Sequence, residues 1–345
     1  MNKKILKIMV SLAVPALIAG CAQEKTTSTG EQAREYLELL MSTEYPGIQP
    51  DKWGIYILKD TPGTGVEWSP EAVYSKLRST VRSIDGTVLT STEADIAKQL
   101  DENDYKPYNY YGPKYQNTSN GTGNAGLEYL LGGMRVGGSR TAIIPAWLLT
   151  TSRYNTKQEY IDACSSSLHM IYEITLEGQC QDILGQEISE LGAYVAAHYG
   201  EAQKSCTYKA GQQDGVFYFV SDTSAFKPED KRADDATLHL TYTGRRLDGQ
   251  AFDTNDESVA LKEGLFVTEK AYEKSSIKFS ATYSSISMDG SSSLVEGFKA
   301  GLYKMHWAGQ KATVLFVSDL GYSSTGSGDR IPPYAPLIFE LELSE

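Results

Sequence analysis

The same series of sequence landmarks occurs twice along this chain, about one domain length apart. Each series has an Asp-Gly pair, a Gly-Leu segment that leads to a later glycine, a β-rich run and a final alternating strand. The first series is Asp85-Gly86, Gly126-Leu127, 141–144 and 168–176, and the second is Asp248-Gly249, Gly301-Leu302, 313–316 and 337–343. A recurring order at this spacing predicts two copies of one architecture. Two unrelated small α+β domains are the alternative.

Both halves are expected to be antiparallel sheets with one short helix laid across each. An Asp-Gly pair between apolar runs is a tight-turn signal. The glycines that follow each predicted helix mark the return of the chain to the sheet. The predicted fold class is therefore α+β, with domains at residues 46–180 and 215–345.

Periodicity predicts the elements around these domains. The expected elements are a helix at 31–41, a strand at 54–58, a helix at 183–199 and a strand at 215–220. The second helix and the polar stretch after it would form a linker at residues 181–214. Residues 103–124 lack periodicity and are expected to be a long surface loop. Residues 256–276 are a charged insertion in the second half.

The N-terminal residues resemble the signal segment of a bacterial lipoprotein. Three lysines accompany a mostly apolar run at residues 5–19, which ends in Ile18-Ala19-Gly20-Cys21, a sequence similar to a lipobox. The run is shorter than the roughly 20 residues that a membrane-spanning helix needs. We expect a signal peptide at 1–20, acylation of Cys21 with palmitate among the acyl chains, and a tether with a short helix at 21–45. A buried core helix or a transmembrane anchor is the alternative.

The resemblance also predicts where the protein resides. Acyl chains on Cys21 would anchor it to a membrane. Ala22 after that cysteine resembles outer-membrane sorting, so we expect an outer membrane lipoprotein on the periplasmic side, with surface exposure as the alternative. Loss of residues 1–20 removes three lysines and changes the formal charge from −12 to −15. This charge argues against nucleic acid as a partner.

The cysteines and histidines predict neither a disulfide nor a metal site. Cys164 and Cys180 bracket the strand predicted at 168–176, whose ends lie roughly 25–30 Å apart, which is too far for a disulfide. A pairing of either one with Cys206 stays open. The histidines are scattered without metal-ligand spacing, at His169, His198, His239 and His306. We therefore expect no metal and no cofactor.

Motifs in the second half resemble those of the FKBP family of peptidyl-prolyl cis-trans isomerases (rotamases). Tyr242-Thr243-Gly244 and Asp248-Gly249-Gln250-Ala251-Phe252-Asp253 resemble the family's signature. Residues 294–298 resemble the segment that enters its helix, and 319–322 and 331–343 resemble its last loop and final strand. These motifs keep the family's order over residues 232–345. The resemblance implies two FKBP-like domains, each a curved sheet wrapped on a short α-helix.

The resemblance also implies which residues form the site. The implied catalytic residues are Tyr242, Phe252, Asp253, Val295, Phe298, Tyr322 and Phe339, and the implied substrate-binding residues are Leu294 and Ile331. Phe298 would be the pocket floor, where the family more often has tryptophan. The Val295 N–H and the Tyr322 hydroxyl would donate to substrate carbonyls, and Asp253 would orient Tyr242. Ser293 stands where many members have a carboxylate, and the rim arginine of the family has no counterpart that the sequence identifies.

An aromatic pocket fits the physics of this reaction. Rotation about an X-Pro bond faces a barrier of about 18–20 kcal/mol that arises from amide resonance. A site that binds the twisted amide better than either planar form lowers this barrier. The twisted amide is less dipolar than the planar amide, so an apolar pocket favours it. The alternative is that these aromatic side chains only fill the core.

The first half keeps the frame of the second but lacks its chemistry. Ser79 is at the tyrosine position, Leu89-Thr90 replaces the Phe-Asp pair, and Leu149 is at the loop tyrosine. We expect a degenerate copy without isomerase activity, used for structure or binding.

The leading prediction is an isomerase and chaperone that assists the folding of exported proteins and takes proline-containing, unfolded or partly folded polypeptides as partners. A macrolide inhibitor would bind the same pocket. The alternative is an inactive FKBP-like binding module of the cell envelope. The 23 tyrosines would also fit a solute- or glycan-binding lipoprotein, although tyrosine suits strands in general.

Overall fold

The computed structural model describes residues 27–93, 95–96, 112–119, 123–200, 207–210 and 213–345. The predicted signal peptide, Cys21, Cys206 and residues 103–111 and 120–122 of the predicted loop lie outside these residues. In the described part of that loop the prediction was wrong, because Lys114–Asn117 form a short strand. Within the described part, no helix is both long enough and apolar enough to cross a membrane. The chain forms two compact units, and the second contains every residue from Gln179 onward.

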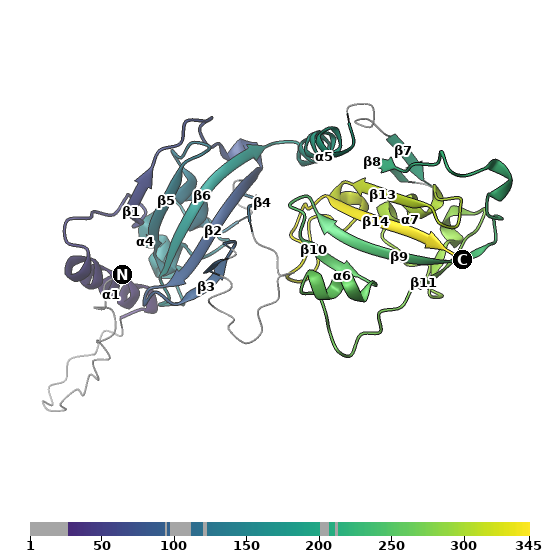
Figure 1. Cartoon of the computed structure of the whole chain (residues 1–345). Helices are drawn as coiled ribbons and strands as arrows, with labels where there is room; N and C mark the ends of the chain where they lie inside the picture. Colours follow the sequence, from purple (N-terminus) through teal and green to yellow (C-terminus); the bar gives the residue numbers. More distant parts are fainter. Residues whose placement is uncertain (1–26, 94, 97–111, 120–122, 201–206, 211–212) are drawn as a thin grey trace, which may run out of the picture. The chain divides into compact units, whose positions relative to one another are not determined.

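The first half carries a six-stranded sheet and three described α-helices (Figure 1). Its elements are α1 (Thr29–Glu44), β1 (Tyr56–Thr61), η1 (Pro70–Ala72), β2 (Tyr74–Ser83), β3 (Val88–Ser91), β4 (Lys114–Asn117), α3 (Ala125–Leu131), β5 (Ser139–Ile144), η2 (Ala146–Leu148), α4 (Lys157–Ala163) and β6 (Met170–Cys180).

The second half carries an eight-stranded sheet. Its elements are α5 (Ile183–Tyr199), β7 (Thr207–Ala210), β8 (Gln213–Val220), η4 (Pro228–Asp230), β9 (Thr237–Arg246), β10 (Ala251–Thr254), α6 (Glu257–Lys262), β11 (Ser275–Lys278), η5 (Tyr283–Ser285), β12 (Ser287–Met288), α7 (Glu296–Tyr303), β13 (Lys311–Phe316), η6 (Ser318–Leu320) and β14 (Leu337–Ser344).

The two sheets share one strand order. The first runs β1-β5-β6-β2, and β2 pairs with both β3 and β4. The second contains β8-β13-β14-β9, and β9 pairs with both β10 and β11. Paired strands are antiparallel in each sheet, so the predicted α+β class with two antiparallel sheets is confirmed. In each half a helix packs on the first of the last two strands, α3 on β5 and α7 on β13.

The Asp-Gly pairs form the hairpin turns that the sequence predicted. Gly86 and Gly249 have φ angles of 92° and 85°, a region that glycine enters without the steric penalty of a side chain. Asp85 accepts a hydrogen bond from the Thr87 amide, and Asp248 accepts one from the Gln250 amide, each at 2.9 Å. Such local side-chain bonds to the backbone are what favour aspartate in turns.

Element boundaries follow from the capping residues. α5 begins and ends as predicted, because Asp182 accepts a bond from the Gly185 amide at 2.9 Å and Gly200 ends the helix with a φ of 92°. β1 runs from Tyr56 to Thr61 rather than from 54 to 58, and the φ of Gly54, 97°, lies outside the range of regular strands. β6 runs from 170 to 180 rather than from 168 to 176. Cys164 and Cys180 are free thiols.

The prediction of a polar linker at 200–214 was wrong in its second part. Residues 207–210 form β7, which pairs with residues 213–216 of β8. Thr207 and Tyr208 are residue types that suit strands. Four residues are too few to show a periodic pattern, which is why the sequence did not reveal this strand.

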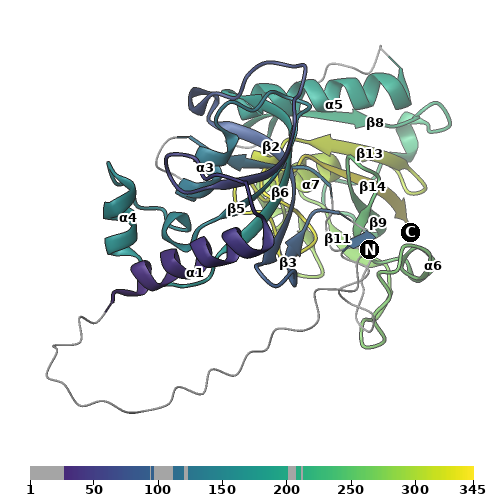
Figure 2. The ribbon, with the colours of Figure 1, turned by 90° about the vertical axis from the view of Figure 1, so that its left-hand side faces the viewer.

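The second half is held together by a core between its sheet and two helices. α7 packs on β13, and α5 lies along β8 (Figures 1 and 2). Leu191 and Val195 of α5 are fully buried in this core. Gly297 and Gly301 let α7 approach the sheet closely, since a Cβ at these positions would lie 2.1 Å from the Phe316 ring and 2.8 Å from Val314.

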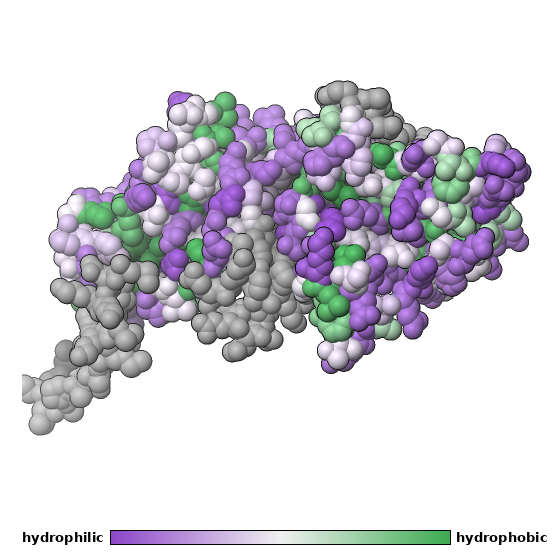
Figure 3. Space-filling view, viewed as in Figure 1, coloured by the Kyte–Doolittle hydropathy of each residue, from purple (hydrophilic) through white to green (hydrophobic). Residues whose placement is uncertain are grey.

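The exposed surface is mostly hydrophilic on the face that Figure 3 shows. Large hydrophobic side chains that are exposed in the second half include Leu261 and Phe266, in the charged insertion at 256–276. Scattered exposed residues of this kind are normal on a globular protein.

His169 ties α1 to the sheet of the first half. Its Nδ1 accepts a hydrogen bond from the Ala146 amide at 3.0 Å, and its Nε2 lies 3.0 Å from the Ala33 carbonyl oxygen. The two partners together require a neutral ring that is protonated on Nε2. Burial lowers the pKa of His169 to about 4. This histidine is a structural residue, because both of its ring nitrogens have partners within the protein.

A methyl group at Gly297 should destabilise the chain. We expect Gly297→Ala to lower the free energy of unfolding by about 1–3 kcal/mol, because the new Cβ overlaps the Phe316 ring. Urea denaturation measures the change. Gly123→Ala is the control, because the nearest atom to its Cβ would be 3.6 Å away. Equal stability of the two variants would contradict this packing.

His169 should make stability depend on pH. The folded chain takes up this proton only near pH 4, whereas the unfolded chain takes it up near 6.5. The unfolded state therefore binds more protons between these values, so stability is full above pH 6.5 and falls by up to about 3 kcal/mol as the pH drops through 4.

Comparison with two variants isolates this effect. His169→Gln cannot titrate and should lose this part of the pH dependence of unfolding, whereas His198→Gln, at an exposed position on α5, should keep it. If all three proteins showed the same pH dependence, His169 would not carry the effect.

Candidate functional site

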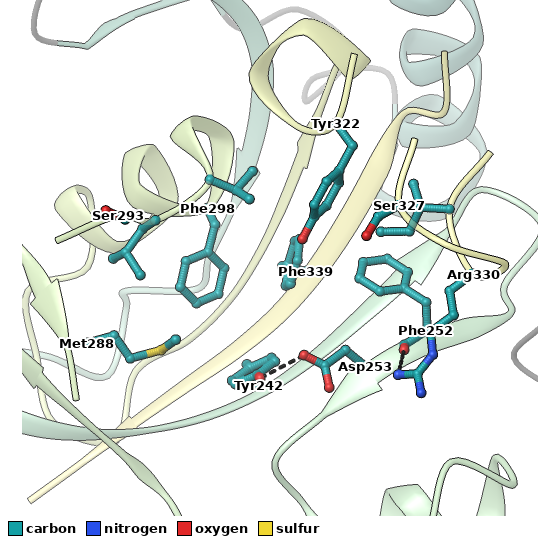
Figure 4. A pocket seen from close by; sticks show the side chains of 13 residues that line it. Tyr242, Phe252, Asp253, Met288, Ser293, Phe298, Tyr322, Ser327, Arg330 and Phe339 are labelled. Carbon is teal, nitrogen blue, oxygen red and sulfur yellow. Dashed lines mark hydrogen bonds between the residues drawn. The ribbon is translucent and has the colours of Figure 1, made fainter. Parts of the chain in front are cut away.

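One pocket of the second half contains all the predicted site residues (Figure 4). Its volume is about 380 Å³, within the range of small-molecule sites. The lining residues are Tyr242, Phe252, Asp253, Met288, Ser293, Leu294, Val295, Phe298, Tyr322, Ser327, Arg330, Ile331 and Phe339. They come from β9, β10, β12, β14, the start of α7 and the segment between η6 and β14. Phe252, Phe298 and Phe339 thus line this pocket and also belong to the hydrophobic core of the second half.

Three buried phenylalanine rings form the walls. The Phe298 and Phe339 ring centres lie 4.9 Å apart at 67°, and those of Phe252 and Phe339 lie 5.6 Å apart at 84°. These edge-to-face contacts are a favourable arrangement of aromatic rings. Gly244 pairs with Phe339 across the sheet. A Cβ there would lie 2.6 Å from the Phe252 ring, so glycine is needed for this close approach.

A β-bulge directs two consecutive side chains to the pocket. The register between β10 and β9 shifts between Ala251 and Asp253, so that Phe252 is the extra residue. In a regular strand, neighbouring side chains point to opposite faces, and a bulge redirects one of them. Phe252 and Asp253 can therefore both line the same pocket.

Tyr242 and Asp253 form a hydrogen-bonded pair on the wall of the pocket. The Tyr242 hydroxyl donates to Asp253 Oδ2 at 2.8 Å. Burial, and then the neighbouring Asp253 carboxylate, raise the pKa of Tyr242 far above its ordinary value. The phenol therefore stays protonated and fixes the orientation of the carboxylate.

Donors at the pocket without a partner in the described part of the protein include the Val295 amide, which precedes α7, and the Tyr322 hydroxyl. Figure 4 shows this hydroxyl directed into the space between the Phe298 and Phe252 rings, over Phe339. Burial, and then the charge of Asp253, raise the pKa of Tyr322. Both groups can donate to a bound carbonyl.

The structure adds two cations that the sequence did not assign. Lys270, in the insertion, pairs with Asp253 Oδ1 at 2.9 Å and donates to the Thr254 carbonyl oxygen at 2.9 Å. Arg330 donates to the Phe252 carbonyl oxygen at 3.1 Å. Met288 and Ser327 were also missed. The only signal in the sequence for such a cation was that the family's rim arginine has no identified counterpart. Contacts made by an irregular insertion leave no periodic pattern in the sequence.

The first half has the same β-bulge but lacks the side chains that line the pocket of the second half. Its β3–β2 register shifts at Leu89, as the register of β10 does at Phe252, and Leu89 is 52% exposed. Counted from the starts of η2 and η6, the position that corresponds to Tyr322 is Thr150 rather than the predicted Leu149. Neither residue carries a phenol.

The described residues hold no group of three or more His, Cys, Asp or Glu side chains that could bind a metal ion. The pocket offers aromatic faces, the Val295 and Tyr322 donors, which have no partner among the described residues, and one fixed carboxylate. This arrangement can bind an apolar ring beside a peptide carbonyl.

Comparisons with known proteins match this half of the chain. Residues 229–344 match the model of the family described as FKBP-type peptidyl-prolyl cis-trans isomerase. FK506-binding protein 1A of Emericella nidulans is 28% identical over 107 residues, which are 31% of this chain and 77% of that protein. FK506-binding protein 1 of Dictyostelium discoideum is 37% identical over 54 residues, which are 16% of this chain and 50% of that protein.

A solved structure of a peptidyl-prolyl cis-trans isomerase from Pseudomonas syringae pv. tomato is also similar. The match has a TM-score of 0.30 and 22% sequence identity, and it covers 47% of this chain and 92% of the other. The family model confirms the predicted FKBP-type resemblance for residues 229–344. The lipoprotein signal, the domain boundaries and the roles of individual site residues stay predictions.

Loss of the Tyr242 hydroxyl should destabilise the protein, whereas loss of the Tyr322 hydroxyl should not. Tyr242→Phe leaves the buried side of Asp253 without its donor, so we expect a loss of about 1–2 kcal/mol in the free energy of unfolding. Tyr322→Phe removes a hydroxyl without a partner in the described protein and is the matched control. Urea denaturation of both variants measures the difference, and equal losses would contradict these assignments.

Proposed function

We propose that the FKBP-type domain at residues 229–344 catalyses cis-trans rotation of X-Pro bonds in unfolded or partly folded polypeptides, in the pocket walled by Phe252, Phe298 and Phe339. The observation that carries this proposal is that aromatic walls, the Val295 amide, the Tyr322 hydroxyl and the Tyr242–Asp253 pair meet in one pocket of this domain. The family to which the domain belongs is one of peptidyl-prolyl cis-trans isomerases.

The proline ring would enter between the aromatic walls, with Phe298 on α7 as the floor. Phe298 is 5% exposed and contacts the rings of both Tyr242 and Phe339, so the floor is rigid. The walls offer little to solvate a planar, strongly dipolar amide. The twisted amide has lost part of its resonance, and the pocket would therefore hold it more favourably than either planar form.

Hydrogen bonds from the Val295 amide and the Tyr322 hydroxyl would hold substrate carbonyls on either side of the rotating bond. Neither donor gives up a protein partner to do so, because neither has one in the described residues. Donors that are already in place need no reorganisation when the substrate rotates. This chemistry requires no covalent step.

Asp253 would face the twisting amide with its carboxylate held on both sides. Tyr242 donates to one oxygen and Lys270 pairs with the other. Lys270 would thereby act as the cation at the pocket rim, where the family has an arginine that the sequence does not identify in this chain. Its side chain is 38% exposed, so this pair is screened by water and contributes more to orientation than to stability.

The wider role proposed for the protein is help with the folding of exported proteins. Uncatalysed prolyl isomerisation takes about 10–100 s, which limits folding where chains arrive unfolded. The N-terminal resemblance to a lipoprotein signal, with Cys21 as the acylated residue, supports a position at the periplasmic side of an outer membrane. Macrolides of the FK506 type would compete with proline for the pocket.

A protease-coupled assay on an X-Pro tetrapeptide tests the proposal. We expect kcat/KM to fall about tenfold or more in Tyr322→Phe and Asp253→Asn, because each removes a group aimed at the rotating amide. Phe252→Ala should abolish both activity and macrolide binding. Phe266→Ala, which removes an exposed ring outside the pocket lining, is the control and should leave kcat/KM unchanged.

The competing function is an inactive binding module. Wild-type protein that binds the macrolide but accelerates rotation no more than background would favour that function over catalysis. Activity that is insensitive to all three pocket substitutions would place the reaction elsewhere in the chain.

A further inference from the structure

Helix α5 lies upstream of the residues that match the FKBP family, yet it belongs to the core of the second unit. The match begins at residue 229, whereas α5 spans Ile183–Tyr199. Leu191 and Val195 are fully buried in the same cluster as Phe298 and Phe339. This helix is thus packed into the domain that carries the pocket.

The buried face of α5 also carries an acid. Glu187 is 1% exposed, and both of its carboxylate oxygens have a partner on η6. The Ser318 amide donates to Glu187 Oε2 at 2.6 Å, and the Ser318 hydroxyl donates to Oε1 at 2.7 Å. A buried carboxylate is tolerated only with such partners, so this contact has a defined geometry.

The charges around Glu187 are mostly negative. Burial first, and then Asp319 of η6 and Glu190 of the same helix, raise the pKa of Glu187 to about 7. Glu190 is itself engaged by Lys76 at 2.9 Å and by the Tyr115 hydroxyl at 3.1 Å. No cation pairs with Glu187 among the described ion pairs. The acid therefore serves mainly as a hydrogen-bond acceptor.

Ser318 connects Glu187 to the backbone around Tyr322. Its carbonyl oxygen accepts hydrogen bonds from the amides of Gly321 and Ser323, each at 2.8 Å. These two amides flank Tyr322 directly in the chain. The backbone on both sides of Tyr322 is therefore hydrogen-bonded to Ser318. The amide and hydroxyl of Ser318 are in turn bonded to Glu187.

The first half has an equivalent connection at the corresponding turn. The Ala146 amide, at the start of η2, donates to His169, whose other ring nitrogen lies 3.0 Å from Ala33 of α1. In each half, the helix that precedes the sheet is thus linked through a buried polar side chain to the first residue of the same 3-10 turn. In the second half the linking side chain is an acid, and the turn leads to a pocket.

We propose that Glu187 is a positioning residue of the isomerase site: by holding Ser318 it fixes the η6 loop so that the Tyr322 hydroxyl points at the bound substrate, and α5 is part of the catalytic unit. The proposal rests on the function proposed above. It assigns a role to a residue outside the family match and outside the pocket lining.

The test compares variants of the full chain in the tetrapeptide assay. We expect Glu187→Leu, which leaves both Ser318 donors without an acceptor, to lower kcat/KM about tenfold or more through displacement of Tyr322. Glu187→Gln should keep activity within about threefold of wild type, because its amide can accept from the Ser318 N–H and donate to the Ser318 hydroxyl. Glu190→Gln removes a charge from the same helix without contact to η6 and should have no effect.

A double-mutant cycle distinguishes positioning from general destabilisation. In the Tyr322→Phe background, Glu187→Leu should lower kcat/KM by only about twofold, because the hydroxyl that it positions is already absent. If Glu187→Leu lowered kcat/KM by the same factor in the Tyr322→Phe background as in the wild type, the proposal would be overturned. If Glu187→Leu does not fold, Ser318→Ala removes one of the two hydrogen bonds and should show the same non-additivity with Tyr322→Phe.

Amide chemical shifts of Ser318, Gly321 and Ser323 separate this proposal from the function on which it rests. They should move in Glu187→Leu and not in Glu190→Gln. Unchanged shifts in an active Glu187→Leu protein would overturn the positioning role alone. Background activity in the wild type would overturn the proposed function, and this role in isomerisation with it, even if the shifts moved.

Discussion

In a regular strand, Phe252 and Asp253 would point to opposite faces of the sheet. The β-bulge at Phe252 removes that constraint and gives the pocket an aromatic wall and a carboxylate from adjacent positions of β10. The close approach of Phe252 to β9 also depends on Gly244, where any side chain would meet the ring. The Tyr242–Asp253 hydrogen bond then fixes the carboxylate against the strand that carries the tyrosine. The other residues of the pocket lie around this bulged pair of strands, β9 and β10.

Much of this arrangement could be predicted from the sequence because local chemistry decides it. The Asp-Gly turns depend on a positive φ and on an aspartate that bonds to its own turn, and both leave a short, readable motif. The limits of α5 follow from Asp182 and Gly200 in the same way. The pocket residues were found through the order of several short motifs. No single aromatic residue would have distinguished a pocket wall from ordinary core.

The parts that the sequence did not reveal are contacts between distant or irregular segments. Lys270 reaches Asp253 from an insertion without periodicity, and Arg330 reaches the Phe252 carbonyl from 78 residues away. Glu187 and Ser318 are 131 residues apart. A charged residue on a helix is usually solvated, so nothing in the local sequence distinguishes Glu187 from its exposed neighbours. Strand β7 was missed for a different reason, because four residues are too short to show alternation.

The strand order of the second sheet has a practical consequence for anyone who isolates this domain. The family match begins at residue 229, but β13 is paired on one side with β8, at Gln213–Val220. A fragment cut at residue 229 would leave the backbone donors and acceptors of β13 unpaired along an open sheet edge, and exposed edges of this kind recruit other chains. The same cut would uncover the apolar surface that Leu191 and Val195 protect. An expression boundary placed before Asp182 keeps that edge covered and the hydrophobic surface enclosed.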